Sequence, residues 1–110
     1  VLLSEGIAQV VSQLVDEIGA DDYVCNHLEF VGGEATGKLL EPVIGGHDTS
    51  KWVKRYAQDH ALDLTKSFAY AAHGADILLL SSVGKPCAVN PDFALRAAAR
   101  DADWPVLEYR

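Results

Sequence analysis

The stretch SFAYAAHGADILLLSSVGKPCAVNPD, residues 67–92, holds the pattern that decides the fold class. A strand-like run at 67–71 leads into a small-residue turn and a short apolar helix at about 75–83, and another buried strand is predicted at 87–89. Strands that alternate with helices are typical of α/β domains, in which right-handed crossovers build a mostly parallel sheet. The stretch therefore predicts a strand–helix–strand unit of such a sheet.

The segments on both sides of this stretch extend the same alternation. Downstream, Asn90 is placed to cap a helix that has Pro91 at its first position, and a final strand is predicted at 104–109. Upstream, an apolar strand at 1–3 is followed by a helix with a 3.6-residue period, which ends at Gly19. The other predicted elements are a short strand at 23–25, a hairpin of 28–31 and 37–40 around Gly32–Gly33, and a helix at about 49–60.

Composition and charge exclude several classes of protein. The 110 residues carry 9 Lys and Arg against 16 Asp and Glu, a net charge of −7, so no basic surface for nucleic acid or an anionic membrane is expected. The apolar runs are far shorter than the roughly 20 residues that span a bilayer, and no signal peptide or membrane anchor is evident. Cys25 and Cys87 suggest two buried, reduced thiols, as expected in a cytoplasmic protein. The length and composition predict a single core.

The beginning of the chain predicts that it is a piece of a longer one. Position 1 is Val, the sequence contains no Met, and Val1–Leu3 has the pattern of a strand already under way. We therefore expect further segments before residue 1.

Several segments together resemble a known family. The runs FAYAAHGADILLL (68–80), VGKP (83–86), AVNPD (88–92) and WPVL (104–107) are similar to the end of a phosphoserine-phosphatase-like member of the haloacid dehalogenase (HAD) superfamily. The upstream strand, hairpin and helix follow the same order. The resemblance implies a Rossmann-like, HAD-type α/β fold with flanking helices, a mostly parallel sheet and a small β-hairpin. Residues 1–110 would be the C-terminal part of one such domain, from the second motif to the end, without the first motif and the cap.

In that family a carboxylate attacks phosphorus, a second carboxylate acts as acid and base, and Mg²⁺ shields the phosphate charge. Both carboxylates lie in a DxDx(T/V) motif directly after a strand. In this chain Asp21 and Asp22 are adjacent, and the DAD of residues 101–103 follows a predicted helix. The resemblance therefore implies that the nucleophile segment lies outside these residues.

The resemblance assigns roles to three residues of this chain. Ser4 matches the hydroxyl of the second motif, which hydrogen-bonds the transferring phosphoryl group, and Lys51 is the nearest match to the lysine that neutralises phosphate charge. Asp76 matches the last carboxylate of the fourth motif, GDxxxD. Taken without the resemblance, Ser4 fits a helix N-cap and Lys51 a solvated surface lysine, so both alternatives stay open.

One position departs from the family pattern. Ala72 stands where the fourth motif has an aspartate that binds Mg²⁺, and a methyl group cannot coordinate this hard cation. The resemblance implies Mg²⁺ as the cofactor, but Asp76 alone makes a weak metal site. A softer metal held by His73 and Asp76, spaced i to i+3, is the alternative.

The family's topology places the nucleophile strand between the strands at 1–3 and 67–71. A central parallel strand is apolar on both faces and pairs on both edges, so we expect these residues to fold stably only with an N-terminal portion or another chain.

Two functions from different classes follow. The first is a structural or regulatory module of a larger protein whose phosphatase chemistry is impaired or lost. The second is an active Mg²⁺-dependent phosphomonoester hydrolase that the missing N-terminal segment completes. Related modules fused to acyltransferases and fatty acyl reductases suggest an accessory domain of a lipid-metabolising enzyme as a further alternative.

Overall fold

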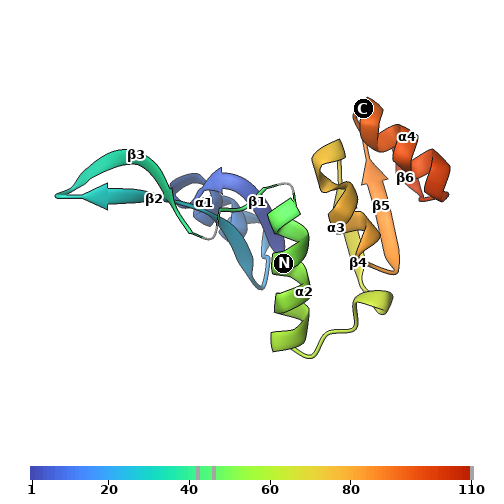
Figure 1. Ribbon diagram of the computed structural model, residues 1–110, viewed down its shortest axis with the longest axis horizontal. Helices are drawn as coiled ribbons and strands as arrows, with labels where there is room; N and C mark the ends of the chain where they lie inside the picture. The colour runs from blue at the N-terminus through green and yellow to red at the C-terminus, as the bar shows by residue number, and fades with distance from the viewer. Residues whose placement is uncertain (42, 46, 110) are drawn as a thin grey trace. The chain divides into compact units, whose positions relative to one another are not determined.

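The computed structural model describes residues 1–41, 43–45 and 47–109, and only the backbone of residues 47 and 48. The described chain divides into two compact units, Val1–Gly45 and Gly46–Arg110, and each unit has its own sheet (Figure 1). Each unit also has its own cluster of buried apolar residues. The single core expected from composition is therefore wrong. The reason is local: each set of three strands packs its apolar residues against its own helices.

The first unit is a three-stranded sheet with one helix. It consists of β1 (Leu2–Ile7), α1 (Ala8–Ile18), β2 (Tyr23–Val31) and β3 (Glu34–Leu40). The strand order is β1-β2-β3, with β1 parallel to β2 and β3 antiparallel to it. The predicted hairpin is confirmed, and Gly32 and Gly33 form its turn with φ angles of 61° and 83°, which favour glycine.

Helix α1 packs on this sheet through a small apolar core. Val11 and Val15 are buried together with Cys25 of β2. The helix ends where the sequence predicts, because Gly19 adopts the left-handed conformation with φ 70°. Its predicted start is wrong: α1 begins at Ala8, Ile7 is the N-cap without a side-chain hydrogen bond, and Ser4 lies inside β1.

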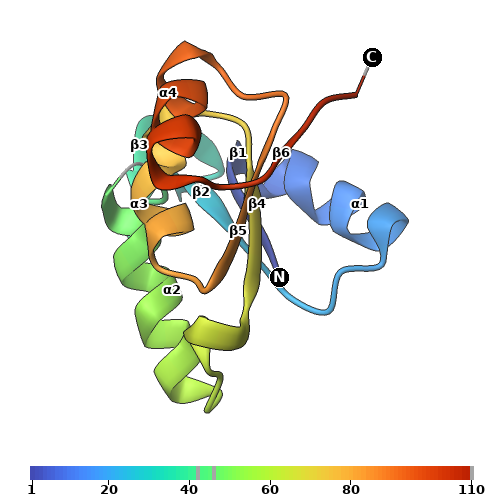
Figure 2. The ribbon, with the colours of Figure 1, turned by 90° about the vertical axis from the view of Figure 1, so that its right-hand side faces the viewer.

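The second unit is built on a parallel sheet of order β4-β5-β6 (Figure 2). The strands β4 (Phe68–Ala71) and β5 (Lys85–Val89) confirm the predicted strand–helix–strand unit. The other elements are α2 (His47–Asp59), the 3₁₀ turns η1 (Leu64–Lys66) and η2 (Gly74–Asp76), α3 (Ile77–Ser81), α4 (Phe93–Ala102) and β6 (Val106–Leu107). The fold class is α/β with parallel strands and flanking helices, as predicted.

Both α3 and α4 lie on one face of this sheet. Leu80, Ala88, Leu95 and Ala99 are each 0% exposed, and Ala69 and Ala71 of β4 pack against this cluster. Phe68 and Tyr70 alternate with those alanines, so they project from the opposite face and are 63% and 61% exposed. One face of the second sheet is thus a core and the other is an exposed apolar surface.

The end of the chain departs from the sequence prediction in two ways. Asp92, not Asn90, caps α4, because its side chain accepts a hydrogen bond from the Leu95 amide. Asn90 instead adopts a positive φ of 41° and accepts a hydrogen bond from the Tyr109 amide at 2.7 Å. The final strand is shorter than expected and contains only Val106 and Leu107.

Both cysteines are buried and free, as predicted. Burial raises the pKa of the Cys25 thiol, which disfavours the reactive thiolate. None of the helices among the described residues is long and apolar enough to cross a bilayer.

Candidate functional site

Ser4 lies in an irregular stretch of β1. Leu3 pairs with Val24 and Ile7 with Asn26, so the three residues Ser4–Gly6 stand opposite a single residue of β2. The Gly6 amide donates a hydrogen bond to Ser4 Oγ at 3.0 Å, which closes a local turn. This turn is the physical reason that Ser4 is not a helix cap: its oxygen binds an amide within the strand. We call residues 4–6 the Ser4–Gly6 bulge.

A buried amide holds the bulge in place. Asn26 is 4% exposed, and its Nδ2 donates to the carbonyl oxygen of Glu5 at 2.8 Å and to that of Ile44 at 3.1 Å. Its Oδ1 accepts from the Ile44 amide at 2.6 Å. One side chain therefore connects the middle of the bulge to the segment that ends the first unit.

In the second unit, the loop after β4 is held by a carboxylate. Asp92 accepts hydrogen bonds from the Gly74 amide, at 2.9 Å to Oδ2 and 3.1 Å to Oδ1, and from the Leu95 amide at 2.9 Å. The Asp92 amide also donates to the Ala72 carbonyl oxygen at 2.9 Å. The bonds from Gly74 and then Leu95 lower the pKa of Asp92, and the nearby His73 adds a smaller effect in the same direction.

This loop carries the position that departs from the family pattern. Ala72 directly follows β4 and is half-buried, and Asp76 is half-buried in η2. Among the described residues no group of three or more His, Cys, Asp or Glu side chains could hold a metal ion. Mg²⁺ binds oxygen ligands in octahedral geometry. This loop offers one carboxylate and a methyl group, so it cannot hold Mg²⁺ unless other segments supply further oxygen ligands. His73 is exposed, and its Nδ1 lies 3.9 Å from Asp92 Oδ2.

The predicted site residues are divided between the units. Ser4 belongs to the first unit, whereas Lys51 and Asp76 belong to the second. Lys51 lies on α2 with an exposed side chain, and α2 packs against both η2 and α3. Within the second unit, the structure therefore packs the helix of Lys51 against the turn of Asp76.

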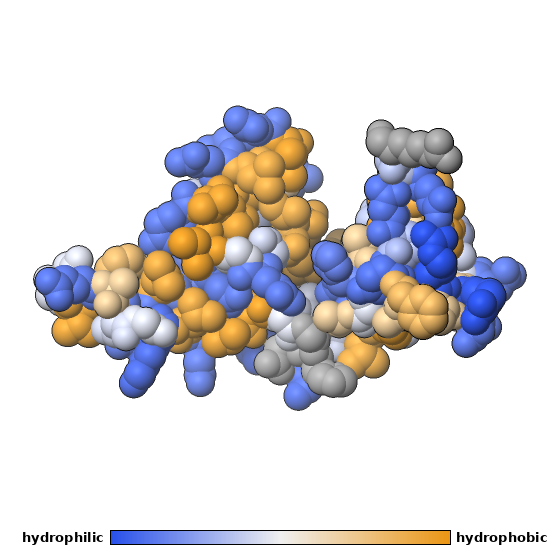
Figure 3. All heavy atoms as spheres, turned by 90° about the horizontal axis from the view of Figure 1, so that it is seen from above, coloured by the Kyte–Doolittle hydropathy of each residue, from blue (hydrophilic) through white to orange (hydrophobic). Residues whose placement is uncertain are grey.

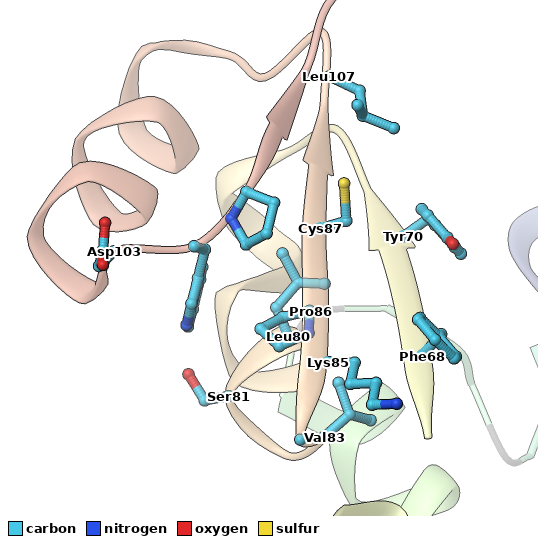
Figure 4. Close-up of a pocket in the computed structure, with 13 residues that line it drawn as sticks. Phe68, Tyr70, Leu80, Ser81, Val83, Lys85, Pro86, Cys87, Asp103 and Leu107 are labelled. Atoms are coloured by element: carbon cyan, nitrogen blue, oxygen red, sulfur yellow. The ribbon is translucent and has the colours of Figure 1, made fainter. Parts of the chain in front are cut away.

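The second unit also has an open cavity of about 710 Å³ (Figure 4). Phe68 and Tyr70 of β4 line it together with Lys85 and Cys87 of β5, and the Lys85 amine lies 4.8 Å above the Phe68 ring centre. None of the predicted site residues lines this cavity. It is largely an apolar surface beside β5 and does not contribute to the candidate phosphate site.

Sequence reasoning missed the two side chains that organise these loops. Asp92 was within the quoted AVNPD run, but its role was given to Asn90 because Asn-Pro is a common start of a helix. Asn26 lies between the predicted strands at 23–25 and 28–31, whereas in the structure a single strand, β2, runs through both and through Asn26. Its signal would have been a short polar side chain at a buried strand position.

The comparisons with known proteins agree with this fold. The family model of haloacid dehalogenase-like hydrolases matches residues 1–81. The chain is 34% identical over 99% of its length to the "inhibition of morphological differentiation protein" of Streptomyces azureus, and 34% identical over 74% of its length to the phosphoserine phosphatase SerB1 of Mycobacterium tuberculosis. A solved phosphoserine phosphatase in apo form matches 98% of the chain with a TM-score of 0.81 at 20% identity, over 52% of that structure.

The chain therefore belongs to the haloacid dehalogenase-like hydrolases, in the phosphoserine-phosphatase-like branch. It spans 39% of the length of the Streptomyces azureus relative and 27% of that of SerB1.

Proposed function

We propose that residues 1–110 are the C-terminal part of a HAD-type phosphatase domain that retains phosphate-binding side chains but has impaired or lost turnover. In this proposal Ser4 donates a hydrogen bond to a phosphoryl oxygen and Lys51 neutralises its charge. The domain serves as a structural or regulatory module of a larger cytoplasmic protein. The observation that carries the proposal is the methyl group of Ala72 at the end of β4, where the family has a metal-binding carboxylate.

The edges of the two sheets support the idea of a partial domain. Among the described residues, β1 pairs only with β2 and β4 pairs only with β5. An unpaired parallel edge with apolar residues beside it is an unfavourable surface for an isolated protein. A strand from an N-terminal segment would supply the missing backbone partners.

Exposed apolar side chains support the same idea. Figure 3 shows hydrophobic surface gathered on the first unit, where Val10, Leu14 and Ile18 of α1 are between 46% and 65% exposed. These residues recur every four positions and so form a second apolar stripe, beside the stripe that packs on the sheet. The second sheet exposes Phe68 and Tyr70 in a similar way. Patches of this kind mark surfaces that another segment covers.

An active hydrolase is the second candidate. The carboxylate of Asp76 is retained, and the helix of Lys51 packs against its turn. In this alternative the N-terminal segment supplies the nucleophile, the acid/base and the other Mg²⁺ ligands, and the complete protein hydrolyses a phosphomonoester.

The test compares Mg²⁺-dependent hydrolysis of a generic phosphomonoester by the complete source protein and by its Ala72→Asp variant. We expect no turnover in the parent and a gain in the variant, because the new carboxylate restores an oxygen ligand in the loop. Ala75→Asp is the matched control, since Ala75 is an exposed residue of the same loop.

A gain with Ala72→Asp but not with Ala75→Asp would support the impaired phosphatase. Turnover by the parent would contradict it and favour the active hydrolase.

A further inference from the structure

Asn26 uses every hydrogen-bonding group of its side chain. A primary amide has two N–H donors and one carbonyl acceptor. In Asn26 the donors bind the carbonyl oxygens of Glu5 and Ile44, and the acceptor binds the Ile44 amide. The side chain is 4% exposed, so water does not replace these bonds if they break.

These bonds fall where the strand ladder is interrupted. The pairing register of β1 with β2 shifts between Leu3 and Ile7, and Glu5 is the middle residue of the Ser4–Gly6 bulge. The Asn26 side chain bonds the Glu5 carbonyl in place of a ladder partner. The bulge is thus fixed by a side chain as well as by its own turn.

The second bonded segment approaches the same bulge. A Cβ added to Gly45 would lie 3.1 Å from Glu5 Oε1, so Gly45 runs directly beside the Glu5 side chain. Ile44 precedes it and is 4% exposed. Asn26 therefore fixes both the bulge and the segment next to it.

We infer that Asn26 is a positioning residue for phosphate binding: its amide holds the Ser4–Gly6 bulge so that the Ser4 hydroxyl is presented in one geometry. This inference rests on the proposed function of Ser4. Ser4 Oγ accepts from the Gly6 amide through one lone pair, so its O–H group is available to donate to a separate acceptor, which the proposal takes to be a phosphoryl oxygen. A bulge that moves would lose this alignment.

The test uses Asn26→Asp in the complete protein, with inorganic phosphate as the ligand and calorimetric titration as the readout. The aspartate keeps the shape and the acceptor for Ile44, but it places an oxygen where the amide donated to two carbonyls. We expect phosphate to bind at least about tenfold more weakly than to the parent at neutral pH. The ratio between the two proteins should shrink toward about pH 5, because a protonated carboxyl donates again to one carbonyl.

Two controls separate positioning from general stability. Asn90→Asp makes the same chemical change at an exposed residue that acts as an acceptor for the Tyr109 amide, so its phosphate affinity should equal that of the parent. Val15→Ala weakens the core of the first unit without touching the bulge, and it too should bind phosphate normally at a temperature where it is folded. If Asn26→Asp does not fold, the uncharged Asn26→Ser variant is measured in its place.

Equal phosphate affinity in the folded Asn26 variant and the parent would overturn the inference while leaving the proposed role of Ser4 intact. A parent that binds no phosphate would overturn the role of Ser4 and the inference together. Weaker binding of Asn26→Asp without the recovery at low pH would assign the effect to misfolding and would also overturn the inference.

Discussion

The two units hold their candidate loops with side chains of similar shape and different chemistry. In the first unit the buried, uncharged amide of Asn26 fixes the Ser4–Gly6 bulge. In the second unit the ionised carboxylate of Asp92, on the surface, fixes the loop after Ala72. A buried amide is costly to break and does not titrate, whereas an exposed carboxylate depends on pH. The first loop should therefore respond to mutation, and the second to acid.

The largest effect that separates the units is expected from Leu80→Ala. Leu80 is 0% exposed and packs with Leu95 in the core of the second unit. In the complete protein, the substitution should lower the free energy of unfolding of that unit by about 3 kcal/mol, and amide exchange should accelerate more in the second unit than in the first. Denaturant titration with hydrogen exchange measures both. Leu78→Ala, on the same helix but 42% exposed, is the control and should cost less than about 1 kcal/mol.

An intermediate effect is expected when the pH falls. Hydrogen bonds from Gly74 and Leu95 lower the pKa of Asp92 in the folded chain, so its ionised form stabilises the fold above the unfolded pKa of about 4. That contribution should disappear as the pH falls from about 4 through the folded pKa. The Asp92→Asn variant keeps a side-chain oxygen that can cap the helix, but this side chain does not titrate, so the stability of the variant should change less with acid.

Thermal unfolding of both proteins between about pH 2 and pH 7 tests this expectation. Asp101→Asn is the control, because Asp101 is an exposed residue of α4 whose carboxylate lies 3.7 Å from the guanidinium of its neighbour Arg100. Identical acid profiles for the Asp92→Asn variant and the parent would show that the carboxylate does not hold the loop.

The smallest effect on stability is expected from Lys51→Ala. The side chain is exposed on α2, so the free energy of unfolding should change by less than about 0.5 kcal/mol. If Lys51 neutralises phosphate charge, affinity for inorganic phosphate should nevertheless fall about fivefold. Lys54→Ala removes an exposed charge from the same helix and should leave affinity unchanged. Equal losses in the two variants would mean that Lys51 acts only through net charge.

Local patterns predict much of the fold because they follow from local physics. The apolar period of α1 and the left-handed Gly19, the Gly32–Gly33 turn, and the order of β4, α3 and β5 all have strong signals within a few residues. The prediction that Ser4 caps a helix is wrong. A strand, a serine and a helix follow one another in the same order whether the serine caps the helix or lies in a bulge, so the local sequence does not distinguish the two.

The candidate site is less predictable for a related reason. Asn26 acts on Glu5 and Ile44, which are far from it in sequence, and no local pattern contains that relation. The roles of Ser4, Lys51 and Asp76 come from the family resemblance, and they stay predictions until phosphate binding is measured. The substitution at Ala72 is visible in the sequence alone, since it changes the type of residue at a motif position.

The central claim is that these residues form part of a domain that another segment completes. The most direct measurement is the amide spectrum and the molecular mass in solution of residues 1–110 alone, beside the complete source protein. The account predicts poor dispersion or self-association of the isolated residues, because the edges of β1 and β4 have no further partner among the described strands, and good dispersion in the complete protein. A well-dispersed monomer of residues 1–110 would contradict it.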